Sequence, residues 1–525
     1  MTSVAHRARA LPRLKFPPLG TTGIVAITGV LLLVSLFVRT RALGASLWMD
    51  EGLSIGIASQ PFADIPGVLR QDGSPPLYYM MLHVWMSIFG NGPGDTQGLS
   101  VAISMLAVPG GLWAGWTLFN RRAGLICAAL GAFNPFLTTY AQETRMYSLM
   151  VVLSLLTSAA FLHVYVFRNR KYLPVFAALL AAMLYTHSWG IFVTAGTLVA
   201  LVPALLATED RRAFFKDVLI GFGVAAILYV PWLPTLLYQT AHTGAPWLNS
   251  PRFGAPVQIS KSLLGGGTVT VAILLGAGSG LAAILATREK SEDDETRTAL
   301  YTVLALGVAT LAIAWLFSQF SPAWTTRYLG VALGPIFLLA SFGLSRAGNL
   351  GIAALVVVLG IWAIPHTAGL KNKSNVTDLA AAANPQLKKG DVVVTLQPEQ
   401  QPLINYNLRS GLTHATELGP VKTQGVMDWR DSQTRLEQAT PTKNLEPLID
   451  RLAVGQHVLL VHPVTSNIDD WDAPWTMLVR RRSAQWGQAL ESDTRFKRDK
   501  AVPAFYRRAR RIGVRGVLYT KTSQR

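Results

Sequence analysis

Two adjacent carboxylates, Asp50 and Glu51, stand in the segment Ser46-Leu-Trp-Met-Asp-Glu-Gly52, about ten residues beyond the first long apolar run, residues 23–38. Charged side chains this close to hydrocarbon are costly, so they indicate a purpose. One purpose is general-base chemistry, in which a carboxylate takes a proton from a hydroxyl group. The alternative is structural: Asp50 caps a short helix through Ala58, and Glu51 stabilises its positive end. The two roles are compatible.

Three further charged residues suit chemistry on a phosphate-linked substrate. Glu143 is a second carboxylate that could position an acceptor, and two acids facing one cavity would raise one pKa, which favours base chemistry. Arg145 and Arg327 are candidate phosphate ligands, because a guanidinium group binds phosphate oxygens bidentately. The alternative for each arginine is a structural ion pair at the membrane edge, for example between Arg145 and Glu143 or Asp50.

Several aromatic residues accompany these charges. His187 lies in a tight turn between two apolar runs, where a hydrogen-bonded turn histidine is the structural interpretation and substrate binding the functional one. Tyr147 and Tyr328 lie within two residues of a candidate arginine and could donate to a phosphate. Tyr78 and Tyr79 are expected as anchors in an aromatic belt, with substrate contact as the other use.

The sequence does not require a metal. Asp50, Glu51 and Glu143 could supply oxygen ligands to a divalent cation, but their spacing does not compel one, and we predict no metal site and no cofactor. Patterns for phosphate-binding and dinucleotide-binding glycine loops, Cys/His metal sites and serine-nucleophile elbows are absent from the sequence.

The composition predicts a polytopic membrane protein. Half of the 525 residues are hydrophobic, only 14% are charged, and the mean hydropathy is +0.33. The net charge of +18 is divided among short clusters, which indicates topology signals and contact with anionic lipid rather than nucleic acid. Cys127 is the only cysteine, so an intrachain disulfide is excluded. Because about ten further spans follow, we interpret the first span as an uncleaved helix and not a signal peptide.

The apolar runs that are long enough to cross a bilayer predict about eleven spans. They lie near residues 22–38, 98–118, 122–139, 146–167, 172–186, 188–207, 217–238, 267–287, 299–318, 327–345 and 350–368. One more apolar segment, residues 75–89, is short and rich in aromatic residues.

The side of the membrane on which the basic clusters fall decides whether this short segment crosses the bilayer. If it does not cross, the basic clusters fall on the cytoplasmic side with the N-terminus, as the positive-inside rule demands. These clusters are Arg121-Arg122, 168–171, 211–216, 288–297 and Arg346. We therefore predict an interfacial helix at 75–90 on the outer face. The same assignment places the candidate site residues on that outer face.

Three regions follow from this topology. Residues 1–21 form a basic cytoplasmic N-terminus, 22–370 a membrane domain whose first outer loop is 39–97, and 371–525 an extracytoplasmic domain. The last region gains charge and turn residues and is predicted to have an α/β fold. Its expected strands are 391–395, 457–461 and 517–520, and its expected helices lie near 376–386, 400–409, 445–453 and 475–489.

Several segments, in order, resemble the GT-C glycosyltransferases, and within them the family 39 or ArnT-like group that includes protein O-mannosyltransferases. Leu47-Trp-Met-Asp-Glu-Gly52 looks like the acidic motif of the family's first outer loop. Asp72 to Gly90 is similar to its juxtamembrane helix, and Ala141 to Ser148 to its second outer motif. An arginine common in relatives is missing from Asp95 to Ser100. Later segments look like actinobacterial members.

The resemblance implies a plasma-membrane enzyme that moves a sugar, such as mannose or arabinose, from a polyprenyl-phosphate donor to an extracytoplasmic lipid, glycan or protein. In that reaction Asp50 is the base, with Glu51 orienting it or the acceptor. Two other classes stay open: a lipid or sugar flippase, and a non-catalytic scaffold for envelope enzymes. Against a flippase, the ionisable residues sit at one end of the predicted spans rather than along a central path.

Overall fold

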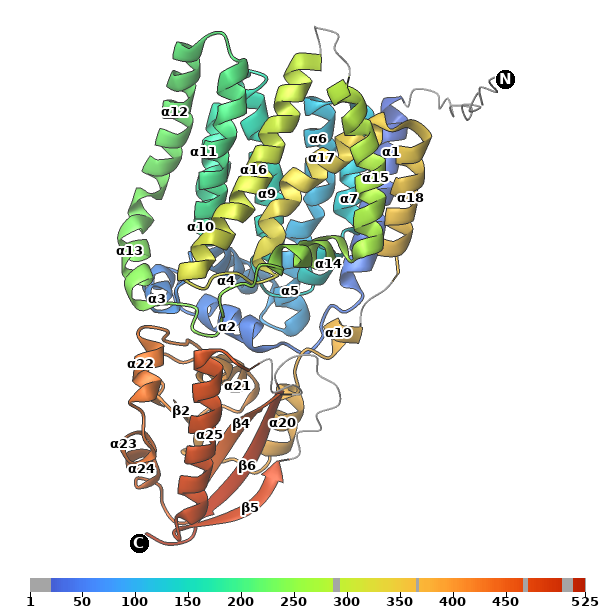
Figure 1. The fold of residues 1–525 in the computed structure, drawn as a ribbon. Helices are drawn as coiled ribbons and strands as arrows, with labels where there is room; N and C mark the ends of the chain where they lie inside the picture. Colours follow the sequence, from blue (N-terminus) through green and yellow to red (C-terminus); the bar gives the residue numbers. More distant parts are fainter. Residues whose placement is uncertain (1–19, 287–292, 365–367, 466–470, 503–512, 525) are drawn as a thin grey trace, which may run out of the picture.

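The computed structural model describes residues 20–286, 293–364, 368–465, 471–502 and 513–524. Most of the basic N-terminus, part of the loop at 288–297 and the arginines at 507–511 lie outside these residues. Figure 1 shows a bundle of long helices stacked on a smaller domain that contains a sheet, with short helices between the two. The chain is therefore a helical multi-pass membrane protein with an additional α/β domain.

The bundle contains helices in all the ranges predicted to span the membrane. Each of the eleven predicted ranges holds a helix, and among the described residues eight helices are long and apolar enough to cross a membrane. The other three ranges hold shorter helices, α7 with α8, α10 and α18, which lie among the long ones (Figure 1). The bundle helices are α1 (Thr21–Thr40), α5 (Pro93–Met105), α6 (Ala107–Leu118), α7 (Arg121–Phe133), α8 (Pro135–Tyr140), α9 (Tyr147–Tyr165), α10 (Leu173–Thr186), α11 (Gly190–Ala207), α12 (Arg211–Tyr229), α13 (Leu233–His242), α15 (Gly267–Ala286), α16 (Asp293–Phe320), α17 (Leu333–Arg346) and α18 (Gly348–Trp362). Short 3-10 turns join some of them: η1 (Arg170–Tyr172), η2 (Val230–Trp232), η3 (Ala255–Val257) and η4 (Tyr328–Ala332).

Polar caps in the sequence set where several of these helices begin. The side chains of Asn120, Asn134 and Asp210 accept hydrogen bonds from the backbone amides at the starts of α7, α8 and α12. Pro135, which has no amide hydrogen to lose, follows Asn134 directly. Asn134 therefore divides one apolar run into α7 and the short α8, and this division sets the direction of the loop that follows.

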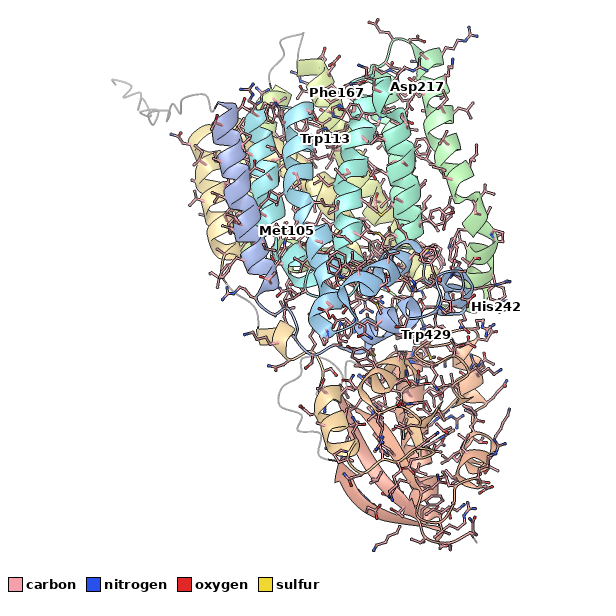
Figure 2. The ribbon with its side chains drawn as sticks, turned by 180° about the vertical axis from the view of Figure 1, so that it is seen from behind. Met105, Trp113, Phe167, Asp217, His242 and Trp429 are labelled. Atoms are coloured by element: carbon pink, nitrogen blue, oxygen red, sulfur yellow. The ribbon has the colours of Figure 1, made fainter. Side chains whose placement is uncertain are left out.

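Short helices cover the end of the bundle that faces the sheet domain. The segment predicted to lie at the membrane surface is helix α4, which lies at this end in Figure 1 beside α2 and α3. At the remote end, Arg168 and Arg170 lie 2.9 and 2.8 Å from the buried Asp217 (Figure 2). The covering helices are α2 (Met49–Ala58), α3 (Ile65–Asp72), α4 (Leu77–Phe89), α14 (Gln258–Leu264) and α19 (Ala368–Lys371).

The second domain is built on a six-stranded mixed sheet in the order β3-β2-β1-β4-β6-β5. Strand β1 is central and runs parallel to both β2 and β4, while β6 is antiparallel to β4 and β5. All four residues of β1 are buried, as expected for a strand covered on both faces. The elements are α20 (Val376–Ala383), β1 (Val392–Thr395), η5 (Pro398–Gln400), α21 (Gln401–Asn407), β2 (Thr413–Thr416), β3 (Gly419–Pro420), α22 (Ser432–Glu437), α23 (Pro441–Asn444), α24 (Glu446–Ile449), β4 (His457–Val464), α25 (Pro474–Ser492), β5 (Phe496–Val502) and β6 (Gly513–Lys521).

Helix α2 belongs to the packing of both domains. Its Leu53 joins the apolar core on the α25 face of the sheet, and its Ile55 joins the core on the α20 and α21 face. A Cβ atom on Gly56 would lie 1.7 Å from the carbonyl oxygen of Gly425, so the two backbones are in direct contact. The sheet domain is therefore packed directly against the helix that begins at the acidic motif.

A second contact docks the sheet domain on α3 and α13. The amide of Trp429 donates to the Gln71 carbonyl at 2.9 Å, and the amide of Asp431 donates to the His242 carbonyl at 2.8 Å. Figure 2 shows Trp429 and His242 on the two sides of this junction. The segment Asp428–Asp431, which has no assigned role in the sequence, thus serves as an interdomain contact.

The backbone contact at Gly56 is testable. Gly56→Ala should destabilise the docked state by about 1–3 kcal/mol, because the added methyl group has no space. Gly67→Ala in α3 is the matched control: nothing lies within 4 Å of its Cβ position, and its effect should stay within about 1 kcal/mol. Thermal unfolding and limited proteolysis of the interdomain linker measure the difference. Equal behaviour of the two variants would contradict the packing described here.

Candidate active site

Glu51 joins four segments of the chain. Its side chain has no exposed surface and pairs with Lys373, whose Nζ atom lies 2.7 Å from Oε2. The backbone amide of Thr144 donates to Oε1 at 2.9 Å, and the Gln97 amide group donates to the same oxygen at 3.1 Å. The amide of Trp48 donates to Oε2 at 3.2 Å. Because both oxygens are engaged, this geometry favours a positioning role for Glu51 over proton transfer.

These contacts also correct the prediction about the helix cap. Helix α2 ends at Ala58 as expected, but its N-cap residue is Trp48, and Asp50 lies inside the first turn. Glu51, and not Asp50, accepts the hydrogen bond from the cap amide. Both carboxylates still lie at the positive end of the helix, which favours negative charge.

Asp50 faces two arginines from distant segments. Its Oδ2 atom lies 2.7 Å from Nη1 of Arg327 and 4.0 Å from Nε of Arg145, and about 10% of its side chain stays exposed. Burial disfavours the charge on Arg327, but the attraction of Asp50 outweighs it, so the pKa of Arg327 lies above its ordinary value. The ion pair predicted between Arg145 and Asp50 is present. Arg327 forms a second ion pair with Asp50 and is the closer of the two arginines.

Arg145 is fixed by the elements around it. Its Nη1 atom donates to the Asp50 carbonyl at 3.3 Å and to Ser54 Oγ at 3.1 Å. Its Nη2 atom donates to the Tyr147 hydroxyl at 3.4 Å. The loop after α8 supplies Arg145, and the carbonyl of the same residue accepts from Ser100 of α5. The second outer motif is thus held against the first by side chains of α2 and α5.

Three aromatic residues line the other side of the arginines. The ring centroids of Tyr147 and Tyr328 are 6.2 Å apart, and His187 lies 4.4 Å from Tyr328. The Nδ1 atom of His187 accepts from the amide of Trp189 at 3.1 Å, which matches the structural interpretation of a turn histidine. Burial, together with the positive charges of Arg145 and Arg327, lowers the pKa of His187 to about 3. The imidazole is therefore neutral near pH 7.

Glu143, Tyr78 and Tyr79 lie in the interior. Glu143 is fully buried, and the backbone amide of its neighbour Thr144 donates to Glu51. Tyr78 and Tyr79 are 0% and 1% exposed, and the Tyr78 hydroxyl lies 3.0 Å from Ser100 Oγ. A belt residue or a substrate ligand needs an exposed face, so the structure does not support either role for the two tyrosines. They pack behind the Arg145 loop, and burial raises the pKa of both phenols.

A cavity of about 240 Å³ opens beside the charged cluster. Thr326, which precedes Arg327, lines it, and so does Tyr140, whose ring lies 4.8 Å from that of Tyr147. Lys261 of α14 adds a positive charge to the wall. The remaining lining residues are Pro135, Phe136, Thr139 and Ser262. The cavity thus joins an apolar wall to a cationic one.

The carboxylates do not fit a divalent cation. Among the described residues, no group of three or more His, Cys, Asp or Glu side chains is placed to hold a metal. Asp50 and Glu51 instead oppose Arg327 and Lys373. A cation at either carboxylate would have to displace an existing positive charge.

Sequence reasoning missed Lys373 and Gln97. Lys373 follows the last span, where a lone lysine reads as an ordinary interfacial residue, yet it has no exposed surface. Gln97 lies in the segment Asp95–Ser100 that lacks the arginine of relatives, and its amide also donates to the Ala45 carbonyl at 3.3 Å. Arg39 is likewise buried and donates to the carbonyls of Ser104 and Gly131.

Comparison with solved structures identifies the fold. ArnT from Cupriavidus metallidurans bound to undecaprenyl phosphate aligns with a TM-score of 0.60 at 16% identity, over 96% of this chain and 99% of that one. The chain has the GT-C fold, of the ArnT type. Arabinofuranosyltransferase AftD from Mycobacteria aligns with a TM-score of 0.58 at 14% identity, over 97% of this chain but 40% of AftD.

A third GT-C structure is more distant. The oligosaccharyltransferase AglB from Archaeoglobus fulgidus, in complex with an inhibitory peptide and a dolichol-phosphate, aligns with a TM-score of 0.52 at 10% identity, over 83% of this chain and 69% of that one. No protein-family model and no curated protein matches the sequence. The likeness therefore rests on the fold, which agrees with the resemblance seen in the sequence motifs.

The Glu51–Lys373 pair gives a stability prediction. Lys373→Met leaves a buried carboxylate without its counter-charge and should destabilise the protein by about 3–5 kcal/mol. The double variant Glu51→Gln/Lys373→Met removes both charges and should be more stable than Lys373→Met alone. Unfolding in detergent, analysed as a double-mutant cycle, measures the coupling. Additive effects of the two substitutions would show that the pair is not coupled.

The His187 environment gives a pH prediction. The unfolded chain takes up a proton at this imidazole near pH 6.5, but the folded chain does so only near pH 3, so acidification through this window favours unfolding. Between these pH values, His187→Gln should make the free energy of unfolding depend less steeply on pH, by up to about 1.4 kcal/mol per pH unit. Unfolding midpoints measured at several pH values test this. An unchanged slope would mean that the imidazole titrates normally in the folded chain.

Proposed function

We propose that this chain is a plasma-membrane glycosyltransferase that moves a sugar from a polyprenyl-phosphate donor to an extracytoplasmic acceptor. The observation that carries the proposal is that one carboxylate and two guanidinium groups lie close together. Asp50 lies 2.7 Å from Arg327 and 4.0 Å from Arg145, although the three residues come from separate outer segments. A base and two phosphate ligands in one place are what this reaction needs.

The chemistry follows from that arrangement. Asp50 takes the proton of the acceptor hydroxyl while the acceptor oxygen forms a bond to the anomeric carbon of the sugar. The bond between that carbon and the phosphate oxygen breaks on the opposite face, so the configuration inverts. The electron pair leaves with the polyprenyl phosphate, whose negative charge Arg145 and Arg327 stabilise. A phosphate leaves as a stable anion, so no general acid is required.

The cavity beside the cluster supports a lipid-linked donor. Phe136 and Pro135 suit the first isoprene units, while Lys261 and Thr326 suit the phosphate next to Arg327. Neutral His187 and Tyr328 complete the binding of the donor headgroup, while the buried Tyr147 acts through its hydroxyl on Arg145. The compared ArnT structure has undecaprenyl phosphate bound and the AglB structure a dolichol-phosphate, which supports the same class of donor here.

The remaining parts of the proposal come from the sequence. Mannose or an arabinose-like pentose is the sugar, and a lipid, glycan or protein is the acceptor. Residues 1–21 lie in the cytoplasm, and 371–525 form an acceptor-side domain outside the membrane. Lipid contacts surround residues 22–370, within which 39–97 form the first outer loop. Glu51 orients Asp50 or the acceptor, and Glu143 is a second carboxylate that positions the acceptor.

Asp50→Asn tests the proposal. Transfer from a radiolabelled polyprenyl-phosphate sugar in purified membranes should fall by about 10²–10⁴-fold, because the base is lost while the side chain keeps its shape. Asp64→Asn is the matched control: Asp64 is an exposed acid in the same outer loop, and its loss should leave transfer unchanged. Unfolding midpoints confirm that both variants fold.

The same assay separates the alternatives. A flippase would yield no glycosidic product even as the wild-type protein, and a scaffold would tolerate Asp50→Asn without loss of envelope function. Either result would refute the proposed reaction. A donor screen with mannosyl-, arabinosyl- and glucosyl-phosphoryl lipids then identifies the sugar.

A further inference from the structure

Buried polar atoms without partners gather at one edge of the sheet domain. Six residues supply them, and each is at most 5% exposed. Five lie at or just beyond the carboxyl ends of β1 and β2, and the sixth, His414, lies within β2. Within the described part of the chain, eight of their side-chain atoms have no hydrogen-bond partner. The atoms are Oγ1 of Thr395, Oε1 of Gln397, Oε1 of Gln400, both amide atoms of Gln401, Nδ1 of His414 and both carboxyl oxygens of Glu417. Such atoms are rare in folded proteins and normally contact water or a ligand.

The position of this edge is the one where open α/β sheets bind ligands. The chain leaves β1 for β2 on one side and later adds β4 on the other, so the strand order reverses at β1. Ligands bind beyond the carboxyl ends of parallel strands at such a point. Here that point abuts the start of α2, where Gln397 Nε2 lies 3.8 Å from Met49 Sδ, one residue before Asp50.

The chemistry of the edge selects its ligand. Most of the unpartnered atoms are oxygens that accept hydrogen bonds, so the ligand must supply many donors. Glu399 also lies here, oriented by the Trp475 indole at 3.1 Å and by Gln397 at 2.8 Å. Burial raises the pKa of Glu399 and, more strongly, that of Glu417. Neither protonation state of a carboxyl group carries positive charge, so these two acids give a phosphate or carboxylate no electrostatic attraction.

We propose that this edge binds the acceptor, and that the acceptor is an uncharged carbohydrate. Vicinal hydroxyl groups donate and accept at the spacing that glutamine amides and carboxyl groups can match, whereas a peptide offers one backbone donor per residue. A sugar held there presents a hydroxyl group towards Asp50 at the start of α2. Because the edge is covered, the acceptor reaches it when the sheet domain shifts relative to α2. The inference rests on the proposed function, since it names the substrate class of the same site.

Gln401→Leu is the test variant. Leucine keeps the volume of the side chain and removes two unpartnered atoms, so the protein should fold with equal or greater stability. Gln386→Leu is the matched control: Gln386 precedes β1 at the opposite end of the strand, and its amide bonds locally to the Ala382 carbonyl at 2.8 Å. Both variants are compared with the wild type as full-length protein in nanodiscs.

Two measurements are made on each protein. Saturation-transfer NMR with arabinan and mannan hexasaccharides reports binding without any donor. Turnover of a polyprenyl-phosphate sugar is then followed with water alone, with each hexasaccharide, with a Ser/Thr-rich peptide and with a lipid acceptor. We expect a hexasaccharide to bind and to be glycosylated. Gln401→Leu should raise its KM at least tenfold, and Gln386→Leu should behave as the wild type.

The outcomes separate the two proposals. If the wild type turns over no donor but binds a hexasaccharide in a Gln401-dependent way, the proposed function fails and the carbohydrate site stands. If the donor is turned over but only the peptide or the lipid accepts the sugar, the inference is overturned and the function stands. Absence of saturation transfer from both hexasaccharides also overturns it. So does a Gln401→Leu protein that is more stable and binds normally, because the edge then holds ordered water only.

Discussion

A carboxylate without exposed surface needs its charge compensated from inside the protein, and Glu51 meets this constraint with Lys373 and three further donors. The donors come from the linker to the sheet domain, the second outer loop, α5 and the start of α2. Each of these segments must therefore converge on one point for the charge to be tolerated. Asp50 directly precedes Glu51, so the same convergence sets its position. It also sets the position of the Arg145 loop, because Thr144 of that loop donates to Glu51. The site depends on this ion pair more than on any residue that would touch a substrate.

Compensation at Asp50 is of a different kind. Arg327 and Arg145 approach it from outside the Glu51 cluster, and one-tenth of its side chain remains open. In the proposed reaction a donor phosphate competes with Asp50 for these two cations, which frees the carboxylate at the moment when it is needed as a base. His187 beside them is neutral, so it adds no charge to that of the two arginines.

Much of the fold could be predicted from the sequence, because apolar runs and β-rich runs are local signals. The eleven span ranges, α4 at the end of the bundle, and strands β1, β4 and β6 lie where the hydropathy and residue types place them. The acidic motif and its helix through Ala58 were also predictable. Lys373 and Gln97 were not, because their partner lies 322 and 46 residues away and nothing local marks a lysine or glutamine as buried. For Tyr78 and Tyr79 the sequence predicted exposure at the membrane interface, because their aromatic character suits it. The tertiary fold instead encloses both side chains.

The contact between Gly56 and Gly425 has a consequence for biosynthesis. Helix α2 leaves the ribosome early, shortly after the first span, but the surface that completes its packing is translated only after the last span. Until then Leu53 and Ile55 have no core to join, and Glu51 lacks the lysine that neutralises it. The nascent polypeptide therefore inserts all its spans with an unfinished outer loop. Glu51, and Asp50 beside it, therefore acquire their final setting only after these parts of the sheet domain have been translated.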